Sequence, residues 1–118
     1  MTTKSDAPLE RVIVKKVIDK LNKLKKVRAI KVHGGGFGSG GQPDVTGCIM
    51  IDGIGWRFDL EGKRPGQKPT ERQKKEMERW GACGSIVGVF TCWEDVVEIF
   101  RRRGVYLEER AEREGGDA

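Results

Sequence analysis

The sequence is first informative through what it lacks. No apolar run approaches the roughly 18 residues of a membrane span, and the first residues lack the apolar stretch of a signal peptide. The three cysteines, Cys48, Cys83 and Cys92, form no C-x-x-C pair, and there is a single histidine. Neither a disulfide framework nor a structural zinc site is therefore expected. We expect a cytoplasmic protein with no membrane partner, whose cysteines are small reduced core residues.

What the sequence has in abundance is charge. Of the 118 residues, 35% are charged and 36% apolar, which fits one domain with a small core. The net charge of +5 is uneven, because residues 1–32 carry 10 Lys/Arg against 3 Asp/Glu, whereas residues 33–60 carry 1 against 3. A basic first quarter beside an acidic middle suggests a polyanion-facing surface around a carboxylate-bearing pocket. A solvated helix face would explain the same charges.

The apolar spacing predicts an α/β fold with the order α-β-β-β-α-β-α. Helical spacing covers 8–24, and strands are expected at 27–33, 45–51, 56–63 and 85–90. Asp52-Gly53 indicates a hairpin. Thr70-x-x-Gln73 and Thr91-x-x-Glu94 read as capping boxes that open the second and third helices. We expect a mixed sheet flanked by helices, with a right-handed crossover before the last strand.

These elements define one domain with short ends. Residues 1–7 are expected to be flexible, residues 8–104 to form the domain, and residues 105–118 to form a charged tail. The third helix is expected to bury Trp93, Val96, Val97 and Phe100 and to stop at Gly104.

Glu10 is the first candidate functional residue. On an ideal helix with Leu9 at 0°, Ile13 and Leu21 lie at about 40° and 120°, and Glu10 falls between them at about 100°. A carboxylate turned toward the core needs a partner, a metal or water. The alternative is a first-turn glutamate at the rim, which the helix dipole favours.

The strand over 56–63 carries the second group of candidates. Alternation places Arg57, Asp59, Glu61 and Lys63 on one face, which could also be a plain polar outer face. The hairpin brings Asp44 back toward Glu61. Two carboxylates and the Gly62 carbonyl beside one ammonium would suit Mg²⁺.

These residues resemble a known nuclease signature. Pro43-Asp44, sixteen intervening residues and Glu61-Gly62-Lys63 are similar to the PD-(D/E)xK pattern. Together with Glu10, Gly41-Gln42, Lys68-x-Thr70-x-x-Gln73 and the closing apolar strand, the series resembles the VRR-NUC (virus-type replication-repair nuclease) domain over about residues 8–100. The family's motif strand often has an apolar residue where Gly62 stands here, a departure with little bearing on ligation.

The resemblance implies a restriction-endonuclease-like fold and a metal-dependent DNA endonuclease. Asp44, Glu61 and the Gly62 carbonyl would bind Mg²⁺ or Mn²⁺, Glu10 would reach the metal directly or through water, and Lys63 would be the catalytic lysine. Gln73 would lie at the site edge; it is equally suited to be the capping partner of Thr70, and the two roles do not exclude each other. Stand-alone phage and bacterial members imply a homodimer that cuts branched DNA such as Holliday junctions, in the host cytoplasm if phage-encoded.

Basic residues around this site are candidate contacts to DNA phosphates. They are Lys15, Lys16, Arg64, Lys68, Arg72, Lys74, Lys75 and His33. The glycine-rich stretch 34–41 matches G-x-G-x-x-G but runs into Pro43 and a strand instead of opening a helix, so no organic cofactor is expected. It is either a loop that carries His33 and Phe37 along DNA or a plain connection.

Two other functions are compatible with these residues. One is a flap or nicking nuclease acting as a monomer or as a subunit of an assembly. The other is a non-catalytic DNA-binding module on the nuclease fold, against which Asp44, Glu61 and Lys63 argue, because a binder has no need of carboxylates beside a phosphate.

Overall fold

The computed structural model describes residues 9–33 and 41–113. Its elements are α1 (Glu10–Asn22), β1 (Val27–Lys31), β2 (Val45–Ile51), β3 (Ile54–Gly62), α2 (Glu71–Ala82), β4 (Ile86–Phe90), α3 (Trp93–Arg101) and the short 3-10 helix η2 (Leu107–Glu109). The predicted α/β class and element order are confirmed. In the described part of the chain, no helix is both long and apolar enough to span a bilayer.

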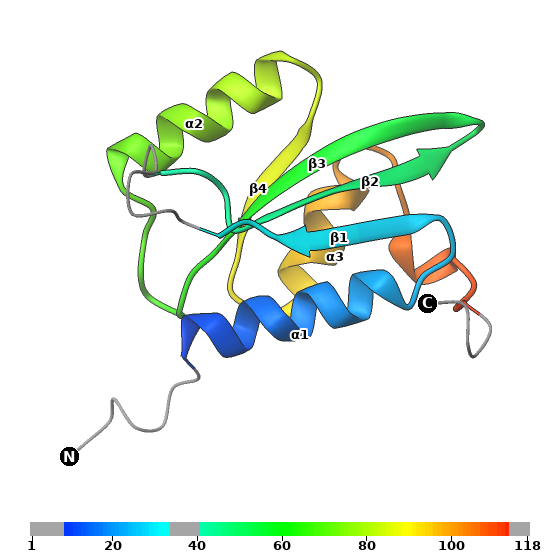
Figure 1. Cartoon of the computed structure of the whole chain (residues 1–118), viewed down its shortest axis with the longest axis horizontal. Helices are drawn as coiled ribbons and strands as arrows, with labels where there is room; N and C mark the ends of the chain where they lie inside the picture. The colour runs from blue at the N-terminus through cyan, green and yellow to red at the C-terminus, as the bar shows by residue number, and fades with distance from the viewer. Residues whose placement is uncertain (1–8, 34–40, 114–118) are drawn as a thin grey trace.

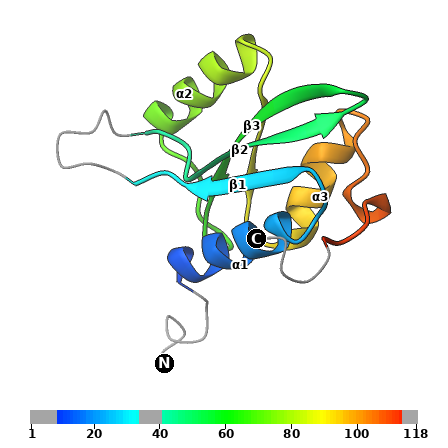
Figure 2. The ribbon, with the colours of Figure 1, turned by 45° about the vertical axis from the view of Figure 1, so that its right-hand side comes forward.

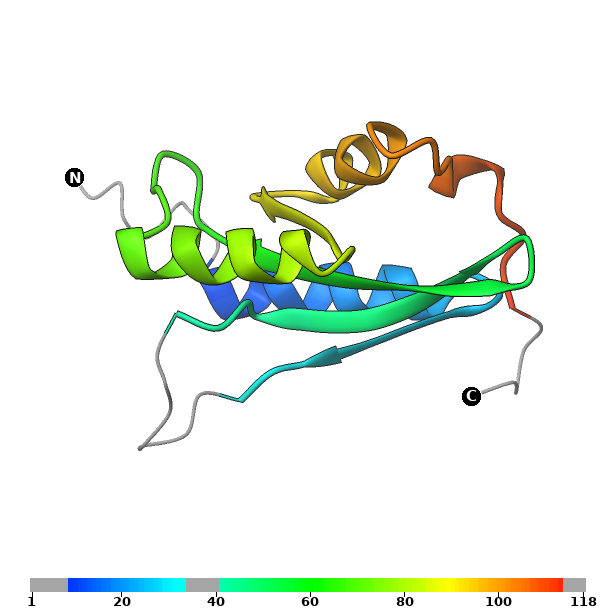
Figure 3. The ribbon, with the colours of Figure 1, turned by 90° about the horizontal axis from the view of Figure 1, so that it is seen from above.

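The four strands form one mixed sheet in the order β1-β2-β3-β4 (Figure 1). The first three strands are antiparallel neighbours, and β4 runs parallel to β3 after the crossover through α2. Helices α1 and α3 lie on the same side of the sheet (Figure 3). Helix α2 lies on the other side, where it contacts β3 and β4 (Figure 2).

The hydrophobic core lies between the sheet and the α1–α3 pair. Phe58 and Leu60 of β3 are fully buried there, and the Phe58 ring meets Phe100 of α3 edge-on at 5.4 Å between centroids. Helix α1 adds Val14 and Val17 to the same core. Since side chains alternate along a strand, burying Phe58 and Leu60 turns their polar neighbours on β3 toward α2.

Two local predictions are confirmed in detail. Asp52 and Gly53 have φ values of 50° and 82°, the two positive values of the type I′ turn that suits a two-residue hairpin. Thr70 is the N-cap of α2 and forms the full capping box with Gln73.

The second predicted capping box is wrong. The N-cap residue of α3 is Cys92, and its side chain makes no capping hydrogen bond to the helix. Instead, the Asp95 carboxylate accepts hydrogen bonds from the Thr91 backbone N–H (2.8 Å) and hydroxyl (2.9 Å). Because the helix begins later than the pattern indicated, Asp95 rather than Glu94 reaches Thr91.

Burial on α3 is also less even than predicted. Val96 and Phe100 are fully buried, whereas Trp93 and Val97 pack against the core while partly exposed. The other differences concern element ends: the first helix stops at Asn22, β1 stops at Lys31, β3 runs from Ile54 to Gly62, β4 begins at Ile86, and α3 ends at Arg101, three residues before Gly104.

The boundary predicted at residue 104 is too early. After α3, the Val105 N–H donates to the Phe100 carbonyl (3.0 Å), and this turn brings Val105 and Leu107 into the core. Further on, Lys25 N–H donates to the Ala111 carbonyl (3.0 Å). The segment to residue 113 therefore packs along the end of α1. The predicted flexible residues 1–7 and the last part of the predicted tail, residues 114–118, lie outside the described residues.

The prediction that the cysteines lie in the core is wrong. Cys48, Cys83 and Cys92 are all free and exposed. Cys48 faces outward from β2, Cys83 follows α2 and Cys92 precedes α3, so each occupies an outward or terminal position in its element.

Candidate metal centre

Three carboxylates from separate elements converge at one end of the sheet. Glu10 is the first residue of α1, Asp44 precedes β2, and Glu61 lies near the end of β3. One oxygen of each lies within 4.8 Å of the others. The hairpin explains half of this arrangement, because Val45 pairs with Leu60 and brings Asp44 beside Glu61, as expected from the sequence.

Backbone hydrogen bonds fix Asp44 on both sides. Its Oδ2 accepts the Gly62 backbone N–H at 2.9 Å, and its carbonyl accepts the Val32 backbone N–H at 2.7 Å. The first contact orients the carboxylate, and the second extends the pairing of β1 and β2 past their named ends. Asp44 is thereby placed by main-chain geometry.

Glu61 is the most buried of the three carboxylates. It is only 1% exposed. Its Oε2 accepts a hydrogen bond from Gln73 Nε2 at 2.8 Å and lies 3.7 Å from Lys63 Nζ. Its Oε1 is buried without a hydrogen-bond partner among the described residues.

The electrostatics of Glu61 reflect this environment. Its pKa is raised from 4.5 to about 8, first by burial and then by the negative charges of Asp44 and Glu10, against the opposing effect of the Lys63 ammonium. One ammonium therefore does not balance three carboxylates packed this closely.

The donor set fits a hard divalent cation. Carboxylate oxygens are the ligands preferred by Mg²⁺ and Mn²⁺. A buried carboxylate oxygen without a partner is costly, and a cation beside it would remove that cost. The raised pKa of Glu61 points the same way, since a positive charge is what this carboxylate lacks.

Packing explains the glycine between Glu61 and Lys63. A Cβ at Gly62 would lie 2.7 Å from Val14 Cγ2 and 2.9 Å from Phe90 Cζ. Any side chain at this position would force Val14 or Phe90 to shift, so the close approach of α1 and β4 accounts for a glycine here.

Gln73 has both of the roles that the sequence left open. Its side-chain oxygen accepts the Thr70 backbone N–H at 2.8 Å, and its backbone N–H donates to the Thr70 hydroxyl at 3.1 Å. Its amide nitrogen simultaneously reaches Glu61. The first turn of α2 and the orientation of Glu61 therefore depend on the same side chain.

Glu10 is partly exposed in the first turn of α1. The sequence left open whether Glu10 is turned toward the core or lies at the rim, and each description fits part of what is seen. It is a first-turn glutamate at the rim, and its carboxylate nevertheless reaches the other two.

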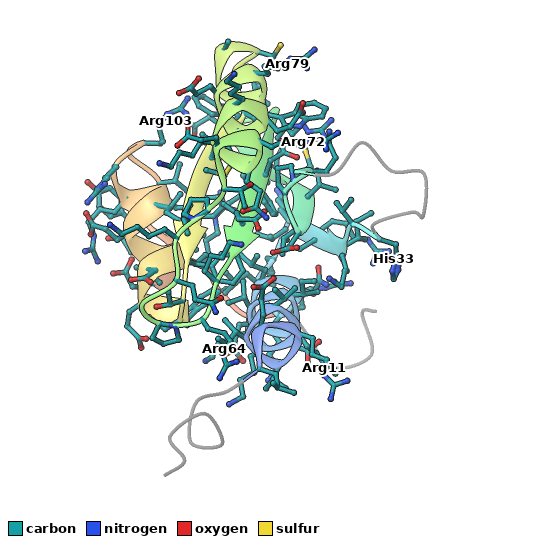
Figure 4. All side chains as sticks on the ribbon, turned by 90° about the vertical axis from the view of Figure 1, so that its left-hand side faces the viewer. Arg11, His33, Arg64, Arg72, Arg79 and Arg103 are labelled. Carbon is teal, nitrogen blue, oxygen red and sulfur yellow. The ribbon has the colours of Figure 1, made fainter. Side chains whose placement is uncertain are left out.

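The predicted DNA-contacting residues spread over several elements around this end of the molecule. Figure 4 views that end, with Arg11 and Arg64 near the start of α1, Arg72 on α2 and His33 after β1. All eight candidates are exposed except Arg64, which is partly so; they are Lys15, Lys16, Arg64, Lys68, Arg72, Lys74, Lys75 and His33. Lys15 forms a surface ion pair with Asp19, and Lys74 forms one with Glu71. Residues 34–40, including Phe37 and most of the glycine-rich stretch, lie outside the described residues.

Sequence reasoning missed a second polar cluster beside the carboxylates. Asp59 is 1% exposed and accepts two hydrogen bonds from Arg57, at 2.9 and 3.1 Å, and one from the Ser85 hydroxyl at 2.6 Å. The Arg57 guanidinium stacks 3.7 Å from the Trp80 ring centroid. Alternation on β3 put Arg57 and Asp59 on the correct face, but no pattern showed that Trp80 covers them.

Gln42 links this second cluster to the carboxylates. Its side-chain oxygen accepts the Trp80 indole N–H at 3.2 Å, and its amide donates to Glu76 at 2.9 Å. Gln42 thus ties the segment before Asp44 to α2.

Comparisons of this chain with protein-family models, with curated proteins and with solved structures give no match.

Proposed function

We propose that this chain is a metal-dependent nuclease that hydrolyses DNA phosphodiester bonds with Mg²⁺ or Mn²⁺ held by Glu10, Asp44 and Glu61. The observation that carries the proposal is Glu61 Oε1, which is buried and has no partner among the described residues, beside two further carboxylates. The spacing of Asp44, Glu61 and Lys63, which resembles the PD-(D/E)xK pattern, favours phosphodiester chemistry over simple ion storage.

Each residue of the centre has a defined task in this proposal. A bound divalent cation supplies Lewis-acid polarisation of the phosphate. Lys63 holds an ammonium 3.7 Å from Glu61, where it neutralises charge on the phosphate or orients the attacking water by donating a hydrogen bond to it. Gln73 and the Gly62 N–H keep Glu61 and Asp44 in place.

The proposed substrate is branched DNA, cut by a homodimer in the cytoplasm. A domain of 118 residues offers little surface for base readout, so selection by DNA shape is more economical than selection by sequence. The four-way junction and the dimer come from the resemblance to the VRR-NUC family. Scattered lysines and arginines around the centre are suited to phosphate contacts.

Cleavage of end-labelled four-way junction, flap and linear duplex tests this proposal, with Mg²⁺, Mn²⁺ or EDTA. Wild type is compared with Glu61→Gln and with the matched control Asp19→Asn, which neutralises an exposed carboxylate on α1. Symmetric nicking of the junction that requires metal and is lost only in Glu61→Gln supports the proposal. Cutting confined to flaps would contradict the four-way junction as substrate but support nuclease activity. If DNA is bound without metal and is not cut, the chain is a non-catalytic DNA-binding module and the nuclease proposal is wrong.

A further inference from the structure

Within residues 9–33 and 41–113, nothing covers half the width of one face of the sheet. On the side away from α1 and α3, helix α2 contacts β3 and β4, and no described element lies over β1 and β2 (Figure 2). This outer face carries Arg28 and Ile30 of β1 and Cys48 and Met50 of β2, all exposed. Together with Lys26, Arg57 and Arg113, which border them, these residues form the outer face.

The outer face has a positive charge. A groove of about 770 Å³ runs along it and is lined by Lys26, Arg28 and Arg113 with Val27, Cys48, Met50 and Gly53; none of the described residues that line it is acidic. In the described part of the chain, Lys26 and Arg28 have no ion-pair partner. Their charges are therefore available to an anion.

The pairing register places residues of β1, β2 and β3 side by side on this face of the sheet. Arg28 pairs with Cys48 across β1 and β2, and Cys48 pairs with Arg57 across β2 and β3. The two arginines thus lie on either side of the Cys48 thiol in one row that crosses three strands. Arg57 and Glu61 share a strand and a face, four residues or about 13 Å apart.

Arg57 is held as a directional hydrogen-bond donor. Its Nε and Nη2 donate to Asp59, and its plane stacks on Trp80, so the guanidinium is fixed at two sides. Nη1 donates to no described atom, and the side chain is 48% exposed. A guanidinium with immobilised stem and a free edge suits a phosphate oxygen, because little rotamer freedom remains to be lost on binding.

We infer that the outer face binds the sugar–phosphate backbone of the DNA that extends away from the metal centre, with Arg57 as a fixed donor and Arg28 and Lys26 as charges. This inference rests on the proposed function. The 13 Å between Glu61 and Arg57 corresponds to about four base-pair steps of duplex at ~3.4 Å each. A second copy of this chain is a poorer occupant, because two such faces would bring their like charges together.

Cys48 provides a direct test on the intact protein. Its thiol sits between the two arginines, whereas Cys92 precedes α3 on the other side of the sheet. We would measure maleimide modification of each cysteine by mass spectrometry, with a 30-base-pair duplex or a four-way junction and Ca²⁺ in place of Mg²⁺. Bound DNA should slow modification of Cys48 about tenfold or more at concentrations well above Kd, and leave Cys92 nearly unchanged. Unaltered Cys48 reactivity in a complex detected by anisotropy overturns the inference.

The same measurement without DNA distinguishes the other occupant. If Cys48 becomes protected as the protein concentration rises, with no nucleic acid present, a second copy covers the outer face and the inference is overturned. Equal reactivity across that range supports it.

Arg28→Gln and the matched control Arg102→Gln test the charge. Arg102 is an exposed arginine that follows α3. Arg28→Gln should weaken duplex binding and reduce the slope of log K against log[salt] by about 0.9, while Arg102→Gln changes neither. Identical slopes for both variants overturn the inference.

Failure of this inference is separable from failure of the proposed function. If DNA is cleaved in a Glu61-dependent way while Cys48 stays reactive in the DNA complex, the nuclease proposal stands and the inference about the outer face fails. Protection of Cys48 by DNA that the wild type never cleaves supports the outer face and removes the nuclease.

Discussion

Asp59 and Glu61 lie two residues apart on the same face of β3, and both are 1% exposed. Their surroundings differ. Asp59 accepts two hydrogen bonds from Arg57 and one from Ser85. Glu61 accepts one hydrogen bond from Gln73, and the Lys63 ammonium lies 3.7 Å away. Two other carboxylates lie nearby, and one oxygen of Glu61 has no partner among the described residues. Burial alone therefore does not distinguish the two carboxylates; the incomplete set of partners is what makes Glu61 the candidate.

The difference between Asp59 and Glu61 is tested most directly by neutralising each carboxylate in turn and measuring the rate of DNA cleavage. Glu61→Gln should lower the cleavage rate by roughly a thousandfold or more, because a metal ligand is lost and with it several kcal/mol of transition-state stabilisation. Asp59→Asn should have a far smaller effect on the rate measured at a temperature where the variant is folded. Equal losses would mean that the two carboxylates do not differ in role.

The effects on the free energy of unfolding should have the reverse order, with a larger loss at Asp59 than at Glu61. Asp59→Ala leaves the Arg57 guanidinium without its carboxylate and removes the acceptor of Ser85, so the free energy of unfolding should fall by about 3 kcal/mol. Glu61→Gln should instead stabilise the metal-free protein at pH 8, because it removes one of three crowded charges. Urea unfolding followed by circular dichroism measures both, and a destabilised Glu61→Gln would contradict the comparison.

The pH dependence of the metal-free protein sharpens the same point. The pKa of Glu61 is about 8 in the folded protein and 4.5 for the ordinary side chain, so the folded state binds more protons between these values. The stabilising contribution of this proton is fully present below pH 4.5 and is lost as pH rises through 8. Relative to Glu61→Gln, wild type should therefore lose melting temperature from pH 5 to 8.5.

Metal should reverse that loss. A divalent cation binds the ionised form, so Mg²⁺ added at pH 8.5 should raise the melting temperature of wild type, by the equivalent of about 2.7 kcal/mol at a hundred times Kd. Glu61→Gln should show little response. A wild-type melting temperature that ignores both Mg²⁺ and Mn²⁺ would argue against a cation site here.

The smallest effects concern the shared role of Gln73. Thr70→Ala removes the capping hydroxyl and should cost about 1 kcal/mol of stability. Gln73→Ala removes the cap partner and also the hydrogen bond to Glu61, so its cost in cleavage rate should exceed that of Thr70→Ala at a similar cost in stability. Parallel losses in the two variants would indicate that Gln73 acts only through the helix end.

Much of this arrangement was predictable from local patterns. The Asp52-Gly53 turn and the alternation on β3 together predict that Asp44 approaches Glu61, because a two-residue hairpin fixes the register. The Thr70–Gln73 capping box is likewise a short-range signal. Such features depend on residues a few positions apart, which is why they can be read without the fold.

The features that sequence reasoning missed depend on contacts between distant segments. The stacking of Arg57 on Trp80 joins β3 to α2, and the Ser85–Asp59 hydrogen bond joins the start of β4 to the middle of β3. Val105 and Leu107 looked like the start of a charged tail because their burial needs the turn after α3. The Asp95 cap differs from the predicted one by a single residue, a margin within which helix starts are ordinarily uncertain.

Gln73 also couples the centre to the motion of a helix end. Its amide holds Glu61, while its carbonyl oxygen and backbone N–H close the first turn of α2. Fraying of that turn therefore releases Glu61, and a ligand that fixes Glu61 must in turn oppose the fraying, because such coupling is reciprocal. A cation bound at the proposed centre should therefore stabilise the first turn of α2. Amide hydrogen exchange at Lys74, whose N–H donates to the Thr70 carbonyl, should slow when a divalent cation binds, without any change in the overall fold.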